Sequence, residues 1–158
     1  MGALKAHDIG VLSQRPFEQA VPEPTDWFEI TQDRVNTFAD ATLDQQWIHV
    51  DPERAKSGPF GAPIAHGQLT LSIMSFLPGG AGVGLPALDG MKLGINYGWN
   101  KVRFMNPVQV GAKIRTVGKL KSVEEKSGML EVINEMTVEI DGADKPACVA
   151  ESVLRIVF

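Results

Sequence analysis

The second half of this chain consists of extended segments separated by turn residues, and this feature limits the possible folds more than any other. Apolar and β-branched residues follow strand-like spacing over residues 91–104, 110–123, 129–140 and 147–158. Turn-forming residues separate these segments at 106–107, 125–128 and 141–144. Successive strands with such short connections predict an antiparallel meander.

The first half of the chain has a helical pattern instead. Residues 27–30 indicate a short strand, and Thr31 then has the position of a helix N-cap, with Asp33 in the first turn. We expect this helix to end near Leu43. A second short helix is expected over residues 52–56, directly after a capping residue and with a proline at its first position.

The longest predicted helix covers residues 67–77. It is rich in Leu, Met and Ile, has a glycine only at its first position and is followed by Pro78, so we expect a buried helix. Helices followed by an antiparallel meander predict an α+β fold. The 158 residues suffice for a single domain, 1–158, in which residues 1–25 form a polar N-terminal arm.

The composition argues against several classes of protein. The net charge of -4 disfavours a nucleic-acid surface, because neutralising phosphates requires clustered Lys and Arg. The apolar runs are interrupted well before the ~20 residues of a membrane span, and residues 1–10 lack a signal-peptide core. We therefore expect a soluble, cytoplasmic protein that binds neither nucleic acid nor membranes. The single cysteine, Cys148, has apolar neighbours and is expected to be a buried thiol.

Two short segments contain the residues that could take part in catalysis. Asp44 and His49 lie five positions apart in a predicted loop after the first helix, and His66 and Gly67 stand at the predicted start of helix 67–77. A carboxylate and an imidazole at this spacing can converge on one small molecule and transfer protons. An enzyme is therefore the leading hypothesis.

These residues resemble the signature of the MaoC-like dehydratases, the family of (R)-specific enoyl-CoA hydratases. That signature reads approximately D-x-N-P-x-H followed by I-x-H-G, and the corresponding segments here are DQQWIH at 44–49 and IAHG at 64–67. The resemblance extends to residues 93–104 and is greatest for the nodulation-protein-N-like branch. Gln46 and Trp47 replace the Asn-Pro of many members, which makes the loop less rigid by sequence.

The resemblance implies a fold and a reaction. The expected fold is a hotdog domain, in which a curved antiparallel sheet wraps the long central helix 67–77, and the expected assembly is a homodimer with strand 91–104 near the partner. The expected reaction is (R)-specific hydration of a trans-2-enoyl thioester, or the reverse dehydration, without metal or redox cofactor. Coenzyme A or acyl carrier protein would then belong to the substrate.

The resemblance also suggests individual roles. Asp44 and His49 would hold one water and deliver its hydroxyl and proton to the β- and α-carbons, although the sequence leaves open which residue is the base. Gly67 at a helix start serves either close packing or anion binding, and the family favours its amide as the oxyanion donor. Ser75 stands nine residues after His66, where the family places a serine that positions the water or the catalytic pair.

The sequence favours structural roles for several other candidates. Asp51 is expected to cap the second helix, and His66 to give structural support. Ser72 should bond back to the preceding helical turn. Lys101 and Arg103 could meet coenzyme A phosphates but are more typical of a solvated sheet face. Four residues could line an acyl tunnel or belong to the core, the latter being favoured: Trp47, Phe60, Met74 and Tyr97.

Other chemistries have weaker support. The three histidines show no H-x-x-x-H or H-E-x-x-H spacing, so a metal site is not expected, and a Gly-x-Ser-x-Gly nucleophile motif is absent. The glycine-rich stretch ending at Gly84 fits a turn or flap better than a phosphate loop. A hotdog thioesterase and a non-catalytic acyl-thioester binding module are the alternatives to a hydratase.

Overall fold

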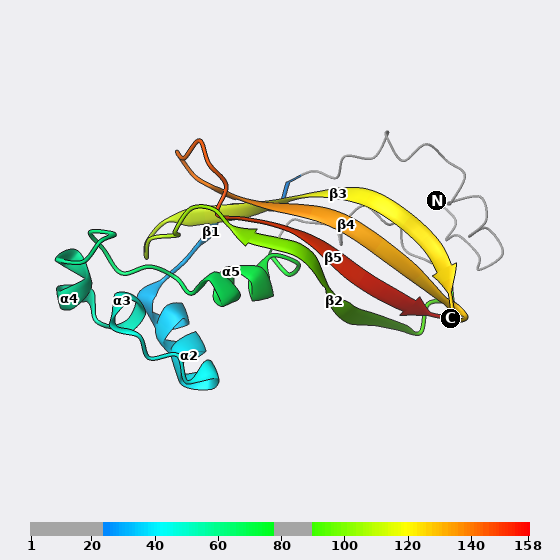
Figure 1. Ribbon diagram of the computed structural model, residues 1–158, viewed down its shortest axis with the longest axis horizontal. Coiled ribbons are helices and arrows are strands. Elements are labelled where there is room, and N and C mark those ends of the chain that lie inside the picture. The colour runs from blue at the N-terminus through cyan, green and yellow to red at the C-terminus, as the bar shows by residue number, and fades with distance from the viewer. Residues whose placement is uncertain (1–23, 78–89) are drawn as a thin grey trace.

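The strands of the protein form one antiparallel sheet, curved along its length (Figure 1). A computed structural model describes residues 24–77 and 90–158. The sheet has five strands in the order β1-β3-β4-β5-β2. Their bounds are Phe28–Glu29 for β1, Leu93–Phe104 for β2, Lys113–Lys126 for β3, Met129–Ile140 for β4 and Cys148–Val157 for β5. The predicted α+β class is confirmed.

The meander prediction is correct for β3, β4 and β5 and wrong for β2. Strands β3, β4 and β5 pair in chain order, but β2 pairs with β5 at the far edge of the sheet. Residues 105–112 do not form a tight turn. They make separate contacts with the segment before α5, through an Ile64–Gln109 bridge and a bond from the Ala65 amide to the Val108 carbonyl at 2.8 Å. This connection carries the chain away from β2 before β3 begins.

Local signals determine the first helix. The helix α2 covers Gln32–Thr42, and the Thr31 hydroxyl accepts a bond from the Arg34 amide at 3.3 Å, as an N-cap does. Leu43 then adopts the left-handed conformation, with φ 65°, and ends the helix. Both predicted ends are confirmed.

Two further short helices follow. The predicted helix over residues 52–56 is confirmed as α4, Pro52–Lys56, and the Asp51 carboxylate accepts from the Arg54 amide at 3.0 Å. Between α2 and α4 the chain forms α3, Trp47–Val50, where the sequence predicted only a loop. A single turn of four residues is too short to produce a detectable apolar period.

The helix predicted over 67–77 is shorter than expected. The regular helix α5 covers Gly67–Ile73, and the chain then tightens into a turn in which the Phe76 amide bonds the Ile73 carbonyl at 2.8 Å. Pro78 disfavours helical geometry at the residue before it, and this accounts for the end of the helical path at Leu77. The element that lies against the concave side of the sheet is therefore two turns of helix plus a tightened turn (Figure 1).

The strand bounds differ from the predictions mainly around one hairpin. Strand β3 runs to Lys126, and Ser127 and Gly128 alone make the turn, with φ of 55° and 74°. Two consecutive positive φ values are the geometry of the type I′ hairpin, whose twist matches that of the strands. The predicted bounds of β4, 129–140, are confirmed.

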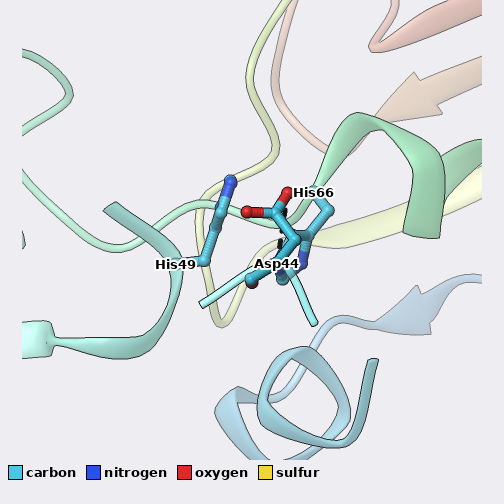
Figure 2. A group of neighbouring side chains, drawn as sticks. All are labelled: Asp44, His49 and His66. Carbon is cyan, nitrogen blue, oxygen red and sulfur yellow. Dashed lines mark hydrogen bonds and ion pairs between the residues drawn. The ribbon is translucent and has the colours of Figure 1, made fainter. Parts of the chain in front are cut away.

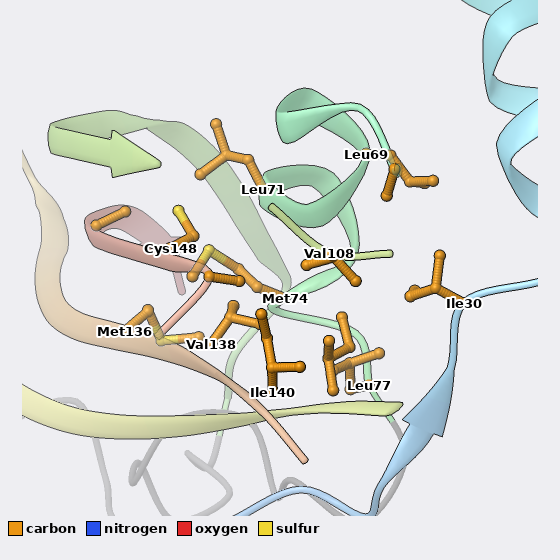
Figure 3. Packing of buried hydrophobic residues seen from close by; sticks show 14 of the residues in the cluster. Ile30, Leu69, Leu71, Met74, Leu77, Val108, Met136, Val138, Ile140 and Cys148 are labelled. Atoms are coloured by element: carbon orange, nitrogen blue, oxygen red, sulfur yellow. The ribbon is translucent and has the colours of Figure 1, made fainter. Parts of the chain in front are cut away.

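The main core lies between α5 and one end of the sheet (Figure 3). Leu69, Leu71, Met74 and Leu77 pack against sheet residues such as Met136 and Val138. Cys148 is fully buried in this cluster, as predicted, and burial raises the pKa of its thiol to about 11. A thiol with this pKa is inert at neutral pH.

The edge strand β2 is exposed over most of its length. Among the described strands only β5 pairs with it, and the side chains of Leu93, Ile95, Tyr97 and Phe104 are exposed. Lys101, on this strand, forms an ion pair with Glu151 of β5 at 3.0 Å. An unpaired edge with apolar side chains is a surface suited to strand pairing.

Two sequence predictions concern residues outside the described ranges. The N-terminal arm, 1–25, lies outside them except for its last two residues, and so does the glycine-rich stretch that ends at Gly84. In the part of the chain that the structure describes, every helix is too short to cross a membrane.

Candidate active site

Three side chains that can exchange protons converge between α2, α3 and α5 (Figure 2). Asp44 follows the residue that ends α2, His49 lies in α3, and His66 is the N-cap of α5. One carboxylate oxygen or ring nitrogen from each lies within 4.8 Å of the other two. The structure thus brings Asp44 and His49 together, as the sequence predicted, and adds His66.

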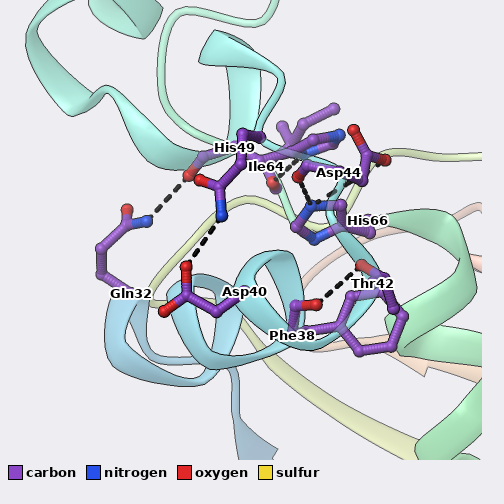
Figure 4. Close-up of polar contacts among 9 residues, drawn as sticks. Gln32, Phe38, Asp40, Thr42, Asp44, His49, Ile64 and His66 are labelled. Atoms are coloured by element: carbon purple, nitrogen blue, oxygen red, sulfur yellow. Dashed lines mark hydrogen bonds and ion pairs between the residues drawn. The ribbon is translucent and has the colours of Figure 1, made fainter.

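The ring of His49 is fixed by one short hydrogen bond. Its Nδ1 atom lies 2.7 Å from the carbonyl oxygen of Ile64, and the side chain is buried. Because a carbonyl oxygen only accepts, Nδ1 carries the hydrogen, and the Nε2 atom of the neutral ring keeps its lone pair. Figure 4 shows this bond beside the bond from the Gln32 amide to the His49 carbonyl, 2.8 Å long, which ties α3 to α2.

Burial keeps His49 neutral. It lowers the pKa of the imidazole below the usual 6.5, and the hydrogen bond to Ile64 opposes this effect. The titratable groups that face the ring are His66, which lowers the pKa further, and Asp44, which raises it. At neutral pH the Nε2 lone pair is therefore available to accept a proton.

The ring of His66 contacts both members of the predicted pair. It stacks on His49 with the ring centroids 3.8 Å apart and an angle of 29° between the planes. Its Nε2 atom lies 3.0 Å from the main-chain oxygen of Asp44 and 4.0 Å from a carboxylate oxygen of the same residue. His66 is 2% exposed, so these contacts lie away from solvent.

Asp44 is the solvent-facing member of the group. Its side chain is 54% exposed, whereas both imidazoles are buried. The neighbouring Gln45 donates to the Asp40 carboxylate of α2 at 2.8 Å, which holds the loop against the helix. A half-exposed carboxylate close to a buried neutral imidazole provides an anion and a proton acceptor in one group.

A cleft of about 300 Å³ opens beside this group. His49 and Gly67 line it, together with mainly apolar residues that include Phe60, Ile64, Phe104 and Val108. An apolar cleft with a few polar groups is the usual form of a small-molecule site. Asp44 does not line the cleft itself and reaches it through its proximity to His49.

Gly67 stands where the cleft meets the start of α5. As the first residue of the helix, it has an N–H without an intrahelical acceptor. A side chain here would be crowded, because an added Cβ atom would come within 3.1 Å of the Phe104 ring. The absence of a side chain at Gly67 lets the aromatic ring and the free amide share one small space.

Ser75 is not among the residues that line this cleft. It lies in the turn after α5 and is half-buried. Ser72 donates to the carbonyl of Gln68 at 2.7 Å, which confirms the predicted bond to the preceding turn. The role of Ser75 stays a prediction.

The other candidates have separate positions. Phe60 lines the cleft, and Met74 belongs to the core. Trp47 packs over Gly58 and under the Arg54 guanidinium, and the ring of Tyr97, 58% exposed, lies under the guanidinium of Arg155. Only Phe60 of the four is therefore placed to meet a bound molecule in this cleft.

The donor set also raises the question of a metal ion. Two imidazoles bind one ion when their in-plane lone pairs converge on it at about 2.0–2.1 Å. The rings of His49 and His66 instead stack almost face to face, and Nδ1 of His49 is engaged with Ile64. The stacked rings therefore do not fit a metal ion that both imidazoles would share.

The sequence predicted only a structural role for His66, whereas its ring lies against His49 and Asp44. It lies 17 positions after His49 in the chain, and no local period links the two rings. The available signal was the position of a histidine directly before the glycine that starts a helix. That position brings His66 to the same end of α5 as the cleft.

Comparison with known proteins identifies the family. The family model described as "MaoC like domain" matches residues 14–141. The chain is 52% identical over 134 residues to 3-hydroxyacyl-thioester dehydratase Z of Mycobacterium tuberculosis. The match covers 84% of this chain and 86% of that protein. The chain belongs to the MaoC-like dehydratase family. It is an enzyme of the hydro-lyase class.

Two further similarities agree with this assignment. The chain is 40% identical over 136 residues to Nodulation protein N of Rhizobium leguminosarum bv. viciae. The match covers 85% of this chain and 83% of that protein. The structure of this chain resembles the (R)-hydratase of A. caviae involved in PHA biosynthesis, with a TM-score of 0.67, 25% identity and coverage of 85% and 95%. The hotdog fold and the nodulation-N-like branch, both predicted from the sequence, are confirmed.

Proposed function

We propose that the protein is an (R)-specific hydratase that adds water to a trans-2-enoyl thioester to give an (R)-3-hydroxyacyl thioester, and that it also catalyses the reverse dehydration. The observation that carries this proposal is a neutral His49, whose Nδ1 is engaged with Ile64 and whose Nε2 keeps its lone pair, in one group with the Asp44 carboxylate. The names of the similar 3-hydroxyacyl-thioester dehydratase and (R)-hydratase support the substrate class and the stereochemistry.

The geometry suggests which group is the base. His49 Nε2 accepts a proton from water while the Asp44 carboxylate holds the water by its second hydrogen, and the hydroxyl oxygen forms a bond to the β-carbon. The electron pair of the double bond moves to the thioester oxygen as an enolate. The imidazolium then returns the proton to the α-carbon on the same face, so that one water has been added and the enzyme is unchanged.

The enolate oxygen requires a hydrogen-bond donor. Gly67 supplies a free backbone N–H at the start of α5, in the same cleft as His49. A preorganised donor aimed at developing negative charge stabilises the transition state more than the ground state. Gly67 is therefore the proposed oxyanion donor.

The proposed reaction requires no bound cofactor. Water, one base, one carboxylate and one oxyanion donor account for every bond that forms and breaks, and coenzyme A or acyl carrier protein enters as part of the substrate. Activity that survives dialysis against EDTA supports this mechanism. Loss of activity with EDTA and recovery with a divalent cation would argue for a metal ion at Asp44, His49 and His66.

The decisive experiment is turnover of a panel of trans-2-enoyl-CoAs, with chiral analysis of the product. We expect loss of the conjugated enoyl absorbance without release of free thiol, and an (R)-3-hydroxyacyl product. Free thiol would identify a thioesterase, and binding without turnover would identify a non-catalytic module. The same panel on acyl carrier protein distinguishes the two carriers.

We also propose that the protein is a homodimer and works in the cytoplasm. The exposed edge of β2, with its apolar side chains, supports an interface with a second copy of the chain. A second chain at this edge would cover strand groups that have no partner among the described strands.

A further inference from the structure

His66 caps α5 by position but not by hydrogen bonding. Its backbone has the extended geometry of an N-cap, with φ -60° and ψ 137°, yet its side chain makes no bond to the helix N-terminus. Instead the ring turns toward Asp44 and His49, which it contacts at 3.0 Å and by stacking at 3.8 Å. The polar contact and the closest ring contact of His66 are therefore made to the two proposed catalytic residues rather than to its own helix.

The contacts of His66 determine which tautomer its neutral ring adopts. The main-chain oxygen of Asp44 can only accept, so the Nε2 atom of His66 carries the hydrogen. Its Nδ1 atom is buried without a hydrogen-bond partner. A proton on Nδ1 would create a buried cation with an unsatisfied N–H, which is costly. The neutral Nε2–H tautomer is the form that these contacts allow.

We propose that His66 is a positioning residue for the hydration step, holding the Asp44 main chain through Nε2–H and the His49 ring through stacking without transferring a proton itself. This inference rests on the proposed function. Asp44 lies in a loop, and its carboxylate is half-exposed. The bond from His66 Nε2 to the Asp44 main-chain oxygen therefore holds this loop next to the buried rings.

A neutral stacked ring suits the charge that forms during the reaction. His49 becomes an imidazolium when it accepts the proton of water. A second cation in contact with it would oppose this step, because like charges in a buried site repel strongly. His66 without a proton on Nδ1 allows the charge to form on His49 alone, beside the Asp44 carboxylate.

Two substitutions separate the two contacts. His66→Gln can keep a donor for the Asp44 oxygen and removes the ring that covers His49. His66→Phe keeps an aromatic ring against His49 and removes the donor. Because one buried hydrogen bond is lost, we expect His66→Phe to reduce kcat about tenfold with little change in KM and with the acid limb of the pH profile unchanged.

His66→Gln should change the pH dependence of activity. Without the stacked ring, water reaches His49 and its pKa returns toward 6.5, so the acid limb of kcat/KM should shift to higher pH. The control is Phe38→Leu, which removes the other aromatic contact of the His66 ring, 5.1 Å between centroids, and leaves the bond to Asp44 in place. This control should keep the wild-type pH profile.

Two outcomes would overturn the proposal. If both His66 variants lose at least ~10²-fold in kcat, as expected for His49→Gln, then His66 transfers a proton. If both folded variants keep the wild-type kcat, KM and pH profile, then His66 only supports the fold. Wild-type protein that hydrates no enoyl thioester would instead refute the proposed function.

Nitrogen-15 NMR of the wild-type imidazoles provides a test that is independent of variant folding. For the neutral His66 ring we expect the hydrogen on Nε2, where it bonds the Asp44 main-chain oxygen. His49 should show the hydrogen on Nδ1. A His66 ring that carries its hydrogen on Nδ1 would contradict the proposal.

Discussion

The Nδ1 atom of His49 donates to the carbonyl oxygen of Ile64 at 2.7 Å. Ile64 lies two residues before His66, so the segment that leads into α5 fixes the tautomer of one imidazole and supplies the other. The sequence left open which of Asp44 and His49 is the base. This hydrogen bond favours His49, because it leaves Nε2 as the unprotonated nitrogen.

The first prediction concerns pH. His49 must be neutral to act as a base, and burial lowers its pKa below 6.5, so the acid limb of the activity profile should be centred below pH 6.5. The measurement is kcat/KM from about pH 5 to 8 in the free enzyme. An acid limb centred above pH 6.5 would contradict the assignment of His49.

The lowered pKa of His49 also makes the free energy of unfolding depend on pH. Since the unfolded chain binds a proton at His49 near pH 6.5 and the folded chain only at lower pH, the unfolded state gains protons first as the pH falls. The contribution of His49 to the free energy of unfolding is therefore present above pH 6.5 and is lost as the pH falls through the folded-state pKa. Denaturant unfolding of wild type and His49→Gln at several pH values measures it.

The second prediction concerns the catalytic pair. Asp44→Asn and His49→Gln should each reduce turnover by at least ~10²-fold, with a much smaller effect on substrate binding. The double variant should be worse than the poorer single variant by only a small factor, because residues that act as a unit are not additive.

Asp51→Asn is the matched control for Asp44→Asn. Asp51 caps α4 in the structure, and asparagine caps a helix equally well, so this variant should keep nearly normal turnover and stability. Folded Asp44 and His49 variants with the activity of the control would refute the proposed mechanism.

The third prediction concerns Ser75. If it positions the water or the pair, Ser75→Ala should lower turnover modestly, by the ~1 kcal/mol that a neutral hydrogen bond contributes. Ser72→Ala is the control, because the Ser72 hydroxyl only bonds back to Gln68. Equal activity of the two variants would assign Ser75 to the packing around α5.

The fourth prediction concerns assembly. Light scattering across a dilution series should give twice the 17.1 kDa mass of one chain. Leu93→Lys places a charge on the exposed edge strand β2 and should shift the mass toward the monomer. Leu43→Lys changes an exposed apolar side chain at the end of α2, away from β2, and should leave the mass unchanged. A wild-type monomer at every concentration would refute the homodimer.

Local features could be predicted because their causes are local. Thr31 and Leu43 delimit α2 through their own backbone and side-chain geometry, and Asp51 caps α4 in the same way. The pair of Asp44 and His49 was also predictable, since five positions around a helix end keep two residues close whatever the rest of the fold does.

Features that depend on distant contacts could not be predicted. The pairing of β2 with β5 depends on the path of residues 105–112 against the segment before α5. The spacing of apolar residues in the sequence does not indicate this path. The stacking of His66 on His49 arises because Ile64 bonds one ring while the backbone at the start of α5 orients the other. Such relationships exist only once the tertiary structure has formed.

The fifth prediction tests the oxyanion donor. Gly67→Pro removes the amide hydrogen at the first position of α5, where proline is tolerated, and the extended backbone of His66 suits a residue that precedes proline. If the Gly67 N–H holds the enolate oxygen, kcat should fall by about 10²–10³-fold, the usual effect of removing one oxyanion donor. Denaturant unfolding checks that the variant is folded.

Gly67→Ala separates the loss of the donor from crowding. The alanine keeps the N–H, but its Cβ atom would come within 3.1 Å of the Phe104 ring, as a proline Cβ would. Phe104 is 48% exposed, so its ring can move aside, and we expect only a small decrease in kcat together with a higher KM. If the alanine and proline variants lose the same kcat, crowding explains both effects, and the Gly67 amide is not the oxyanion donor.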